Sequence, residues 1–213
     1  MKQLMEAGHL KLAVLASGRG SNFDAICQGI DKKLLDAEIT VLISDNPNAP
    51  ALQKAAARGI ETLHINPREF SGRNDYESVL VDELKARNID LVVLAGYMRL
   101  VGKVFLSAFE NRVLNIHPAL LPSFQGLHAQ KQALDYGVRI SGCTVHLVDE
   151  GMDTGPIILQ KEVPVLDTDD EEALSKRILR EEHQIYWQAL QLIAEGRVWI
   201  EGRRVIIKNS SLD

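Results

Sequence analysis

The stretch Leu10–Asn22, LKLAVLASGRGSN, decides the fold class. Leu10–Ala16 is an apolar run of strand length, and the glycine-containing segment Ser17–Asn22 follows it directly. The residues after this segment have helical composition, so the stretch predicts a strand, a tight loop and a helix over Asn22–Gly29. A near-continuous apolar strand that leads into a helix in this way is typical of a parallel sheet covered by helices.

The same alternation of strand and helix continues along the chain. Further strands are expected at Glu38–Ile43, Glu61–Ile65, Leu91–Ala95 and Arg112–Ile116, and further helices at Pro50–Arg58 and Asp75–Arg87. Each crossover between parallel strands should be right-handed. The sequence therefore predicts an α/β fold with a Rossmann-like, mostly parallel sheet and helices on both faces.

The pattern changes after about residue 139. Two longer extended segments, Ile140–Val148 and Ile157–Val163, predict mixed or antiparallel strands toward the C-terminus. We expect a single domain over residues 1–213, with a core at about 10–196 and a C-terminal hairpin or tail at 197–213.

A long C-terminal helix is expected at about Asp169–Glu195. Thr168 and Glu171 have the spacing of a capping box, and Gly196 supplies the stop. Apolar residues at helical spacing should face the sheet, namely Leu174, Ile178, Ile185, Ala189 and Ile193.

Composition and charge exclude several classes of protein. The chain has 213 residues, 46% apolar and 25% charged, with a net charge of −5. A nucleic-acid binder normally has a basic surplus, so no nucleic-acid partner is expected. No apolar run approaches about 18 residues, so no membrane span is expected. Cys27 and Cys143 form no CxxC pattern and suit reduced thiols in the cytoplasm.

The loop after the first strand has two readings. Its glycines and the amides at the helix start would favour an anion such as phosphate. The alternative is an ordinary tight turn with Ser21 or Asn22 as the helix cap. Phe23 stands where a dinucleotide fingerprint has its third glycine, and no Gly-Lys-Ser/Thr follows, so neither nucleotide motif is present.

Two later segments carry side chains suited to catalysis. Asn115 and His117 lie two apart in an expected strand and should project from one face. An amide donor beside an imidazole is a plausible pair for acyl transfer, although a structural histidine at a strand end is the alternative. Asp149–Asp153 is rich in carboxylates and glycine, and its residues either serve a site or only form a turn.

Other motifs of enzyme sites are missing. His9, His64 and His128 form no HExxH motif, so no metal is expected, and His146 is interpreted as a packed histidine. No Gly-x-Ser-x-Gly elbow occurs, which counts against a serine hydrolase.

Four segments together resemble the phosphoribosylglycinamide formyltransferase family. They are LASGRGSNFDAI from Leu15, LAGYMRL from Leu94, LNIHPALLPSFQGLHAQKQAL from Leu114 and GCTVHLVDEGMDTGPIILQ from Gly142. The resemblance extends over about residues 11–195 and implies transfer of a formyl group from 10-formyltetrahydrofolate to the amino group of glycinamide ribonucleotide. Both partners are small molecules, no metal is implied, and a homodimer is an option that the sequence leaves open.

The resemblance also implies roles for individual residues. The catalytic residues would be Asn115, His117 and Asp153. Those for glycinamide ribonucleotide would be Gly20, Ser21, Asn22 and Glu182. Those for the folate would be Arg73, Met98, Arg99, Leu100, Val101, Asn115, Asp149, Glu150, Gly151, Met152 and Asp153. Asp153 would orient His117 and favour its charged form.

Two rival members of the same superfamily are not expected from this sequence, and a third rival belongs to another class of protein. Methionyl-tRNA formyltransferase adds a C-terminal RNA-binding domain, and little sequence follows the long helix here. Formyltetrahydrofolate deformylase adds an N-terminal regulatory domain, and the first strand here begins near residue 10. A non-catalytic nucleotide-binding module would bind a phosphate ligand without folate binding or turnover. It would leave the pattern of Asn115, His117 and Asp153 as coincidence.

Overall fold

The computed structural model describes residues 1–209, which fall into two compact units. One unit is Gly8–Asn115, and the other combines Met1–Ala7 with the chain from Ile116 onward. Residues 210–213, which belong to the expected tail, lie outside the described part of the chain.

The unit Gly8–Asn115 is built on parallel strands in the order β4-β3-β2-β5-β6. Their bounds are β2 (Leu10–Leu15), β3 (Ala37–Ser44), β4 (Glu61–His64), β5 (Leu91–Leu94) and β6 (Val113–His117), of which the last continues into the other unit. β5 is buried along its whole length and β2 at every position except Lys11. This burial on both faces explains the near-continuous apolar runs in the sequence.

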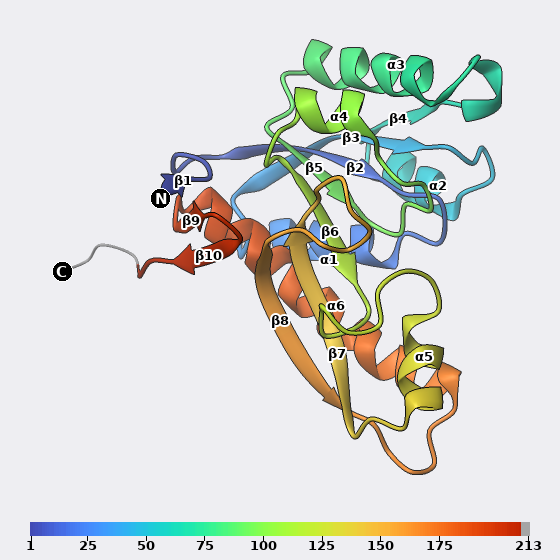
Figure 1. The fold of residues 1–213 in the computed structure, drawn as a ribbon. Coiled ribbons are helices and arrows are strands. Elements are labelled where there is room, and N and C mark those ends of the chain that lie inside the picture. The colour runs from blue at the N-terminus through green and yellow to red at the C-terminus, as the bar shows by residue number, and fades with distance from the viewer. Residues whose placement is uncertain (210–213) are drawn as a thin grey trace. The chain divides into compact units, whose positions relative to one another are not determined.

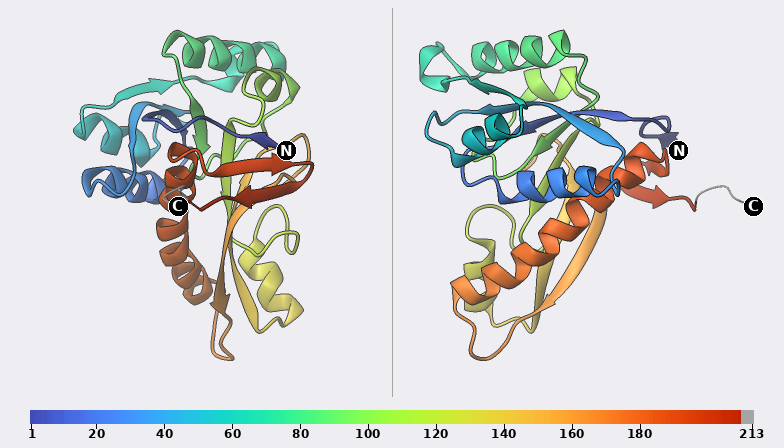
Figure 2. Two further views of the ribbon diagram at one scale, coloured as in Figure 1. Left: turned by 90° about the vertical axis from the view of Figure 1, so that its left-hand side faces the viewer. Right: turned by 180° about the vertical axis from the view of Figure 1, so that it is seen from behind.

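Helices cover both faces of these strands. α3 (Arg73–Ala86) and α4 (Lys103–Ala108) lie on one face, whereas α1 (Ser21–Asp31) and α2 (Pro50–Ala57) lie on the other (Figures 1 and 2). A short 3-10 helix, η1 (Pro67–Glu69), precedes α3. The expected parallel α/β arrangement is therefore confirmed, although α4 was not expected.

The second unit contains the antiparallel pair β7 (Ile140–Leu147) and β8 (Ile157–Pro164). The long helix α6 (Glu171–Ala194) packs along both strands, and α5 (Ala129–Tyr136) contacts α6 (Figure 2). This confirms the antiparallel strands and the long C-terminal helix. The apolar face expected for the helix is also confirmed, since all five of its residues are buried.

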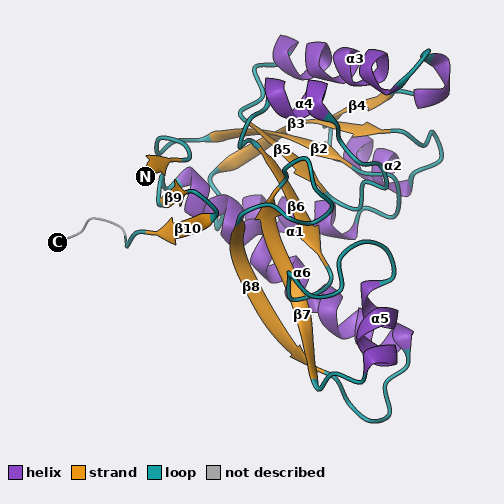
Figure 3. Cartoon of the chain, in the orientation of Figure 1, coloured by secondary structure: helices purple, strands orange, loops and turns teal. Residues whose placement is uncertain are grey.

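A small sheet with the order β1-β9-β10 completes this unit (Figure 3). β9 (Val198–Glu201) and β10 (Arg204–Ile207) form the expected hairpin. β1 (Lys2–Gln3) pairs with β9 and was not expected, because two residues are too few to show a periodic pattern.

The predicted cap of α6 is wrong, and the cap that the alternative interpretation placed at Ser21 or Asn22 of α1 is not observed. At α6 the Asp170 carboxylate accepts a hydrogen bond from the Ala173 amide at 2.7 Å, so Asp170 replaces the Thr168–Glu171 capping box. At α1 the cap position is Gly20, which has a left-handed backbone and no side-chain cap. Ser21 and Asn22 are therefore the first helical residues and not caps.

Candidate active site

The glycine loop after β2 holds the start of α1 close to α2. Gly20 has a φ of 72°, and a Cβ atom there would lie 2.8 Å from the Cβ of Ala51. Both observations require glycine at this position. Ser21 and Asn22 follow as the first residues of an 11-residue helix, and the N-terminal amides and dipole of a helix favour an anion.

The loop after β5 lies against the loop after β2. The Ser17 amide donates to the Gly96 carbonyl at 3.1 Å, and the Met98 amide donates to the Ser17 hydroxyl at 3.0 Å. Both loops follow the carboxyl ends of parallel strands, where ligands bind in open α/β sheets. The glycine loop after β2 and the start of the segment 98–101 are thus brought together within this unit.

Arg73, from α3, contacts the same segment. Its guanidinium donates to the Leu100 carbonyl at 2.9 Å. The Arg99 guanidinium lies over the ring of Tyr76 at 5.6 Å. Met98 and Leu100 are 69% and 57% exposed, so they form an apolar surface that ligand binding could cover.

One buried side chain from α3, that of Glu77, fixes the far end of this segment. The Glu77 carboxylate, buried at 2% exposure, accepts hydrogen bonds from the Gly102 amide at 2.5 Å and the Phe105 amide at 3.3 Å. It satisfies free amides at the start of α4, which has no cap of its own. The structure brings the sequence-predicted folate residues Arg73 and 98–101 together in this unit.

His117 lies at the end of β6 and is only 4% exposed. Its Nε2 is 2.8 Å from the Phe124 carbonyl oxygen. A carbonyl can only accept, so Nε2 carries the proton in that contact. The other nitrogen, Nδ1, lies 3.3 Å from Oδ2 of Asp153. The predicted pairing of these two side chains is therefore present in the structure.

Asp153 has a left-handed backbone, with a φ of 53°. Its Oδ2 accepts a hydrogen bond from the Gly126 amide at 2.9 Å, and its main-chain carbonyl accepts one from the Gln125 side chain at 3.1 Å. Left-handed conformations are uncommon away from glycine and persist where the surroundings hold them. The segment after His117 supplies that support.

Burial and charge set the protonation of the pair. Burial lowers the pKa of His117 below its ordinary value, although the Phe124 carbonyl and the Asp153 charge act to raise it. Burial acts to raise the pKa of Asp153, but hydrogen bonds from His146 and the Gly126 amide hold it below its ordinary value. At pH 7 Asp153 is therefore a carboxylate and His117 is neutral. The expected effect of Asp153 on His117 has the predicted direction, but burial is the larger effect.

Sequence analysis missed the second histidine of this cluster. His146, on β7, is 1% exposed, and its Nε2 lies 3.6 Å from Oδ1 of Asp153. Its Nδ1 is 2.8 Å from the Leu147 carbonyl. The interpretation of His146 as a packed histidine is right about burial and incomplete about contacts. The sequence pattern that could have revealed His146 is its spacing from Thr144. Two polar side chains two residues apart lie on the same face of a buried strand.

The other residues that the sequence predicted for the site in this unit are those of the loop Asp149–Met152 and Glu182. They differ in burial and in contacts. The Asp149 carboxylate accepts hydrogen bonds from the Gly151 amide at 3.1 Å and the Thr154 hydroxyl at 2.5 Å, so it shapes the turn. Glu150, Gly151 and Met152 are exposed. Glu182 is buried on α6, at 6% exposure, and its charge contributes to raising the pKa of the buried Cys143 after burial itself.

Asn115 is the last residue of the unit Gly8–Asn115 and pairs in register with Leu94 of β5. It is partly exposed and stands two residues before His117 in the same strand. Side chains two apart in a strand project from the same face.

Residues 1–209 contain neither a candidate metal site nor a helix that could span a membrane. No group of three His, Cys, Asp or Glu side chains in that range could hold a metal ion. None of the helices in the described range is long and apolar enough to cross a membrane. Both cysteines are buried and free.

Comparisons with known proteins now add to this geometry. A family model described as formyl transferase matches residues 10–190. The phosphoribosylglycinamide formyltransferase of Bacillus subtilis (strain 168) is 42% identical over 176 residues, which cover 83% of this chain and 90% of that one. The trifunctional purine biosynthetic protein adenosine-3 of Drosophila melanogaster is 41% identical over 93% of this chain, and the match spans 15% of that protein's length.

Solved structures agree with the sequence relatives. Glycinamide ribonucleotide transformylase 1 from Symbiobacterium toebii is 48% identical, with a TM-score of 0.93, and the match covers 98% of this chain and 96% of that one. A family match over most of the chain and relatives at these identities lead to one conclusion: this chain belongs to the formyl transferase family.

Proposed function

We propose that this chain is a phosphoribosylglycinamide formyltransferase. It transfers the formyl group of 10-formyltetrahydrofolate to the amino group of glycinamide ribonucleotide, a step in the synthesis of the purine nucleotide IMP. The observation that carries the proposal is the buried contact of His117 with Asp153, 3.3 Å between Nδ1 and Oδ2, in a chain of this family.

The catalytic residues in this proposal are Asn115, His117 and Asp153. The neutral amine of the substrate attacks the formyl carbon and forms a tetrahedral intermediate with an oxyanion. Asn115 stabilises that oxygen by donating a hydrogen bond, and His117 stabilises it through the positive charge that the imidazole gains. Collapse of the intermediate breaks the bond from carbon to N10 of the folate and restores the carbonyl.

The protonation states of the pair support this role. His117 is neutral at rest because burial lowers its pKa, and Asp153 beside it favours the charged imidazole. Negative charge that develops on the oxyanion adds to that of Asp153, so His117 becomes charged as the intermediate forms. The proton lost by the attacking nitrogen arrives at N10, and His117 with Asp153 transfers it.

Substrate binding is proposed for two groups of residues. Gly20, Ser21 and Asn22 bind the phosphate of glycinamide ribonucleotide, because the start of a helix favours an anion. Glu182 contacts the same substrate. The folate is bound by Arg73, the segment 98–101, Asn115 and the loop Asp149–Asp153. No metal takes part.

We also propose that residues 1–213 act as one formyltransferase domain in the cytoplasm. Two buried, free cysteines support a reducing compartment. A homodimer stays a prediction, which light scattering on the purified protein would check.

The decisive experiment follows tetrahydrofolate production by absorbance, starting from a 10-formyl folate. We expect turnover only when glycinamide ribonucleotide is present, with the formylated ribonucleotide as the second product. Equal turnover with water alone would support a deformylase, and binding of the ribonucleotide without turnover would support a non-catalytic module.

A further inference from the structure

The C-terminal hairpin contacts the loop that carries Asp153. Arg203, in the turn between β9 and β10, donates a hydrogen bond from Nη2 to the Thr154 carbonyl at 2.5 Å. Thr154 directly follows Asp153 in the chain. The hairpin and the loop belong to the same compact unit. A segment to which the sequence assigned no role thus touches the proposed catalytic loop.

The turn of the hairpin places Arg203 at its tip. Glu201 of β9 pairs with Arg204 of β10, so Gly202 and Arg203 are the only residues of the turn. Gly202 has a φ of 58°, and a two-residue hairpin turn with glycine first is a common way to join two strands. The Arg203 side chain therefore projects from a short turn and not from a long loop.

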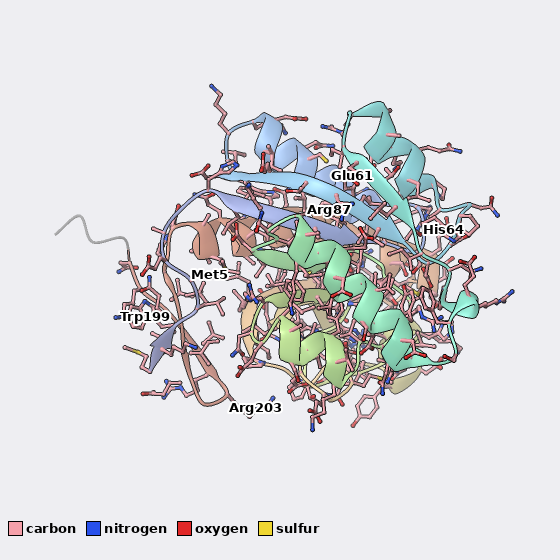
Figure 4. The ribbon with its side chains drawn as sticks, turned by 90° about the horizontal axis from the view of Figure 1, so that it is seen from above. Met5, Glu61, His64, Arg87, Trp199 and Arg203 are labelled. Carbon is pink, nitrogen blue, oxygen red and sulfur yellow. The ribbon has the colours of Figure 1, made fainter. Side chains whose placement is uncertain are left out.

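The base of the hairpin is held in place by the rest of the small sheet and the end of α6. The Gln3 side chain donates to the Gly196 carbonyl at 2.8 Å, and the Arg197 Nε donates to the Lys208 carbonyl at 2.7 Å. The Lys208 ammonium lies 3.6 Å from the centre of the Trp199 ring, and Figure 4 labels both Trp199 and Arg203. These contacts make the hairpin a supported element.

The loop Asp149–Gly155 needs such external support. Asp153 has a left-handed backbone without being glycine, a conformation that surrounding contacts must hold. The Thr154 hydroxyl is bonded to Asp149 inside the loop, so it gives the loop no tie to other segments. The main-chain carbonyls of Asp153 and Thr154 are instead held by Gln125 and Arg203, respectively.

We propose that Arg203 is a positioning residue that braces the loop Asp149–Gly155 and thereby keeps Asp153 oriented toward His117. The guanidinium suits this task, because its donors lie in a rigid plane and stay protonated at any physiological pH. The effect of Arg203 on catalysis rests on the proposed function. The support that Arg203 gives to the loop through its hydrogen bond to Thr154 does not.

The test uses hydrogen exchange of the intact protein, read by mass spectrometry. In Arg203→Ala, we expect peptides that cover residues 149–156 to exchange about 3- to 10-fold faster, as expected from loss of one hydrogen bond. Peptides from the hairpin should be unchanged. Arg204→Ala is the matched control, since Arg204 is the next residue and is also exposed. Arg203→Lys should restore part of the protection.

Activity gives a second reading of the same variants. We expect Arg203→Ala to lower kcat by about 3- to 10-fold while KM for glycinamide ribonucleotide is unchanged, because the brace acts on Asp153. The proposal would be wrong if hydrogen exchange of residues 149–156 were unchanged in Arg203→Ala. It would also be wrong if Arg204→Ala accelerated that exchange equally. Faster exchange at 149–156 in a protein whose parent transfers no formyl group would confirm the brace and reject the proposed function.

Discussion

The carboxylate of Asp153 lies between two buried imidazoles. His117 Nδ1 is 3.3 Å from one of its oxygens, and His146 Nε2 is 3.6 Å from the other. The far nitrogen of each ring is held by a main-chain carbonyl, from Phe124 and Leu147 respectively. His117 therefore completes its contact with Asp153 only when it carries a second proton. The protonation of His117 thus depends on the charge of Asp153.

The first prediction concerns His117 and Asp153, which are 36 positions apart in the sequence. His117→Ala and Asp153→Asn should each lower kcat severely, and the double variant should be little worse than the poorer single variant. Because the Asp153 charge raises the pKa of His117, Asp153→Asn should also move the imidazole titration, followed by NMR, to lower pH. Additive losses in kcat together with an unmoved titration would remove Asp153 from the mechanism.

The second prediction concerns His146 and the acid limb of the pH profile. The hydrogen bond from His146 helps to hold the pKa of Asp153 below its ordinary value, so His146→Phe should raise that pKa. Asp153 must be ionised to assist His117, so kcat should begin to fall at a higher pH than in the parent enzyme. His146→Gln, which keeps a donor group, should shift the limb less. If kcat of His146→Phe begins to fall at the same pH as in the parent enzyme, His146 has only a packing role and does not affect the pKa of Asp153.

At the scale of elements, the loop between β2 and α1 depends on one glycine. A Cβ at Gly20 would lie 2.8 Å from the Cβ of Ala51, and its φ of 72° is unfavourable for other residues. Gly18, in the same loop, has nothing within 4 Å of its Cβ position and no positive φ. These two glycines therefore form a matched pair.

The third prediction uses that pair. Gly20→Ala should raise KM for glycinamide ribonucleotide by about 5- to 30-fold, because anion binding at a helix N-terminus contributes about 1–2 kcal/mol. Affinity for the folate should change little. Gly18→Ala should leave both unchanged. Equal, normal KM values for the two variants would mean that the loop is only a turn.

The fourth prediction concerns the start of α6. Asp170→Ala should lower the free energy of unfolding by about 1 kcal/mol, since the Asp170 carboxylate caps the Ala173 amide. Thr168→Ala should have almost no effect, because Thr168 is not the cap. Urea unfolding of both variants, followed by circular dichroism, measures the difference. A larger loss in Thr168→Ala would restore the capping box that the sequence predicted.

At the scale of the whole molecule, the burial of His117 makes stability depend on pH. Burial lowers the pKa of His117 below its value of 6.5 in the unfolded chain. The unfolded state therefore binds more protons than the folded state as pH falls through this value. The contribution of His117 to stability is complete above pH 6.5 and is lost as pH falls below it. Asp153, whose pKa is also lowered, contributes stability above about pH 3.8 and loses that contribution only as pH falls below this value.

The fifth prediction follows from this sign. The urea midpoint should fall between pH 7.5 and pH 5.5, and the fall should be smaller in His117→Gln. The exposed His64 (Figure 4) provides the control, so His64→Gln should keep the full pH dependence. A midpoint that rises on acidification, or one that His117→Gln does not affect, would contradict a buried neutral imidazole.

Sequence alone determined the local elements of this protein. Apolar runs such as Leu10–Ala16 and Leu91–Ala95 predicted buried parallel strands, and the period of the apolar residues predicted α6 and its buried face. These signals are local, because burial on one or two faces imposes a periodic pattern on consecutive residues. Motif resemblance added His117 and Asp153 as partners, a pairing that periodicity does not contain.

Tertiary structure alone decided which polar groups complete the cluster around Asp153. Gly126 is 27 positions from Asp153 and Arg203 is 49 positions from Thr154, and no pattern of consecutive residues encodes either contact. The sequence predicted only that His146 is a packed residue of a strand. The structure places its imidazole 3.6 Å from the Asp153 carboxylate. Hydrogen bonds need donors and acceptors within about 3 Å, and for residues far apart in the chain only the folded backbone sets that distance.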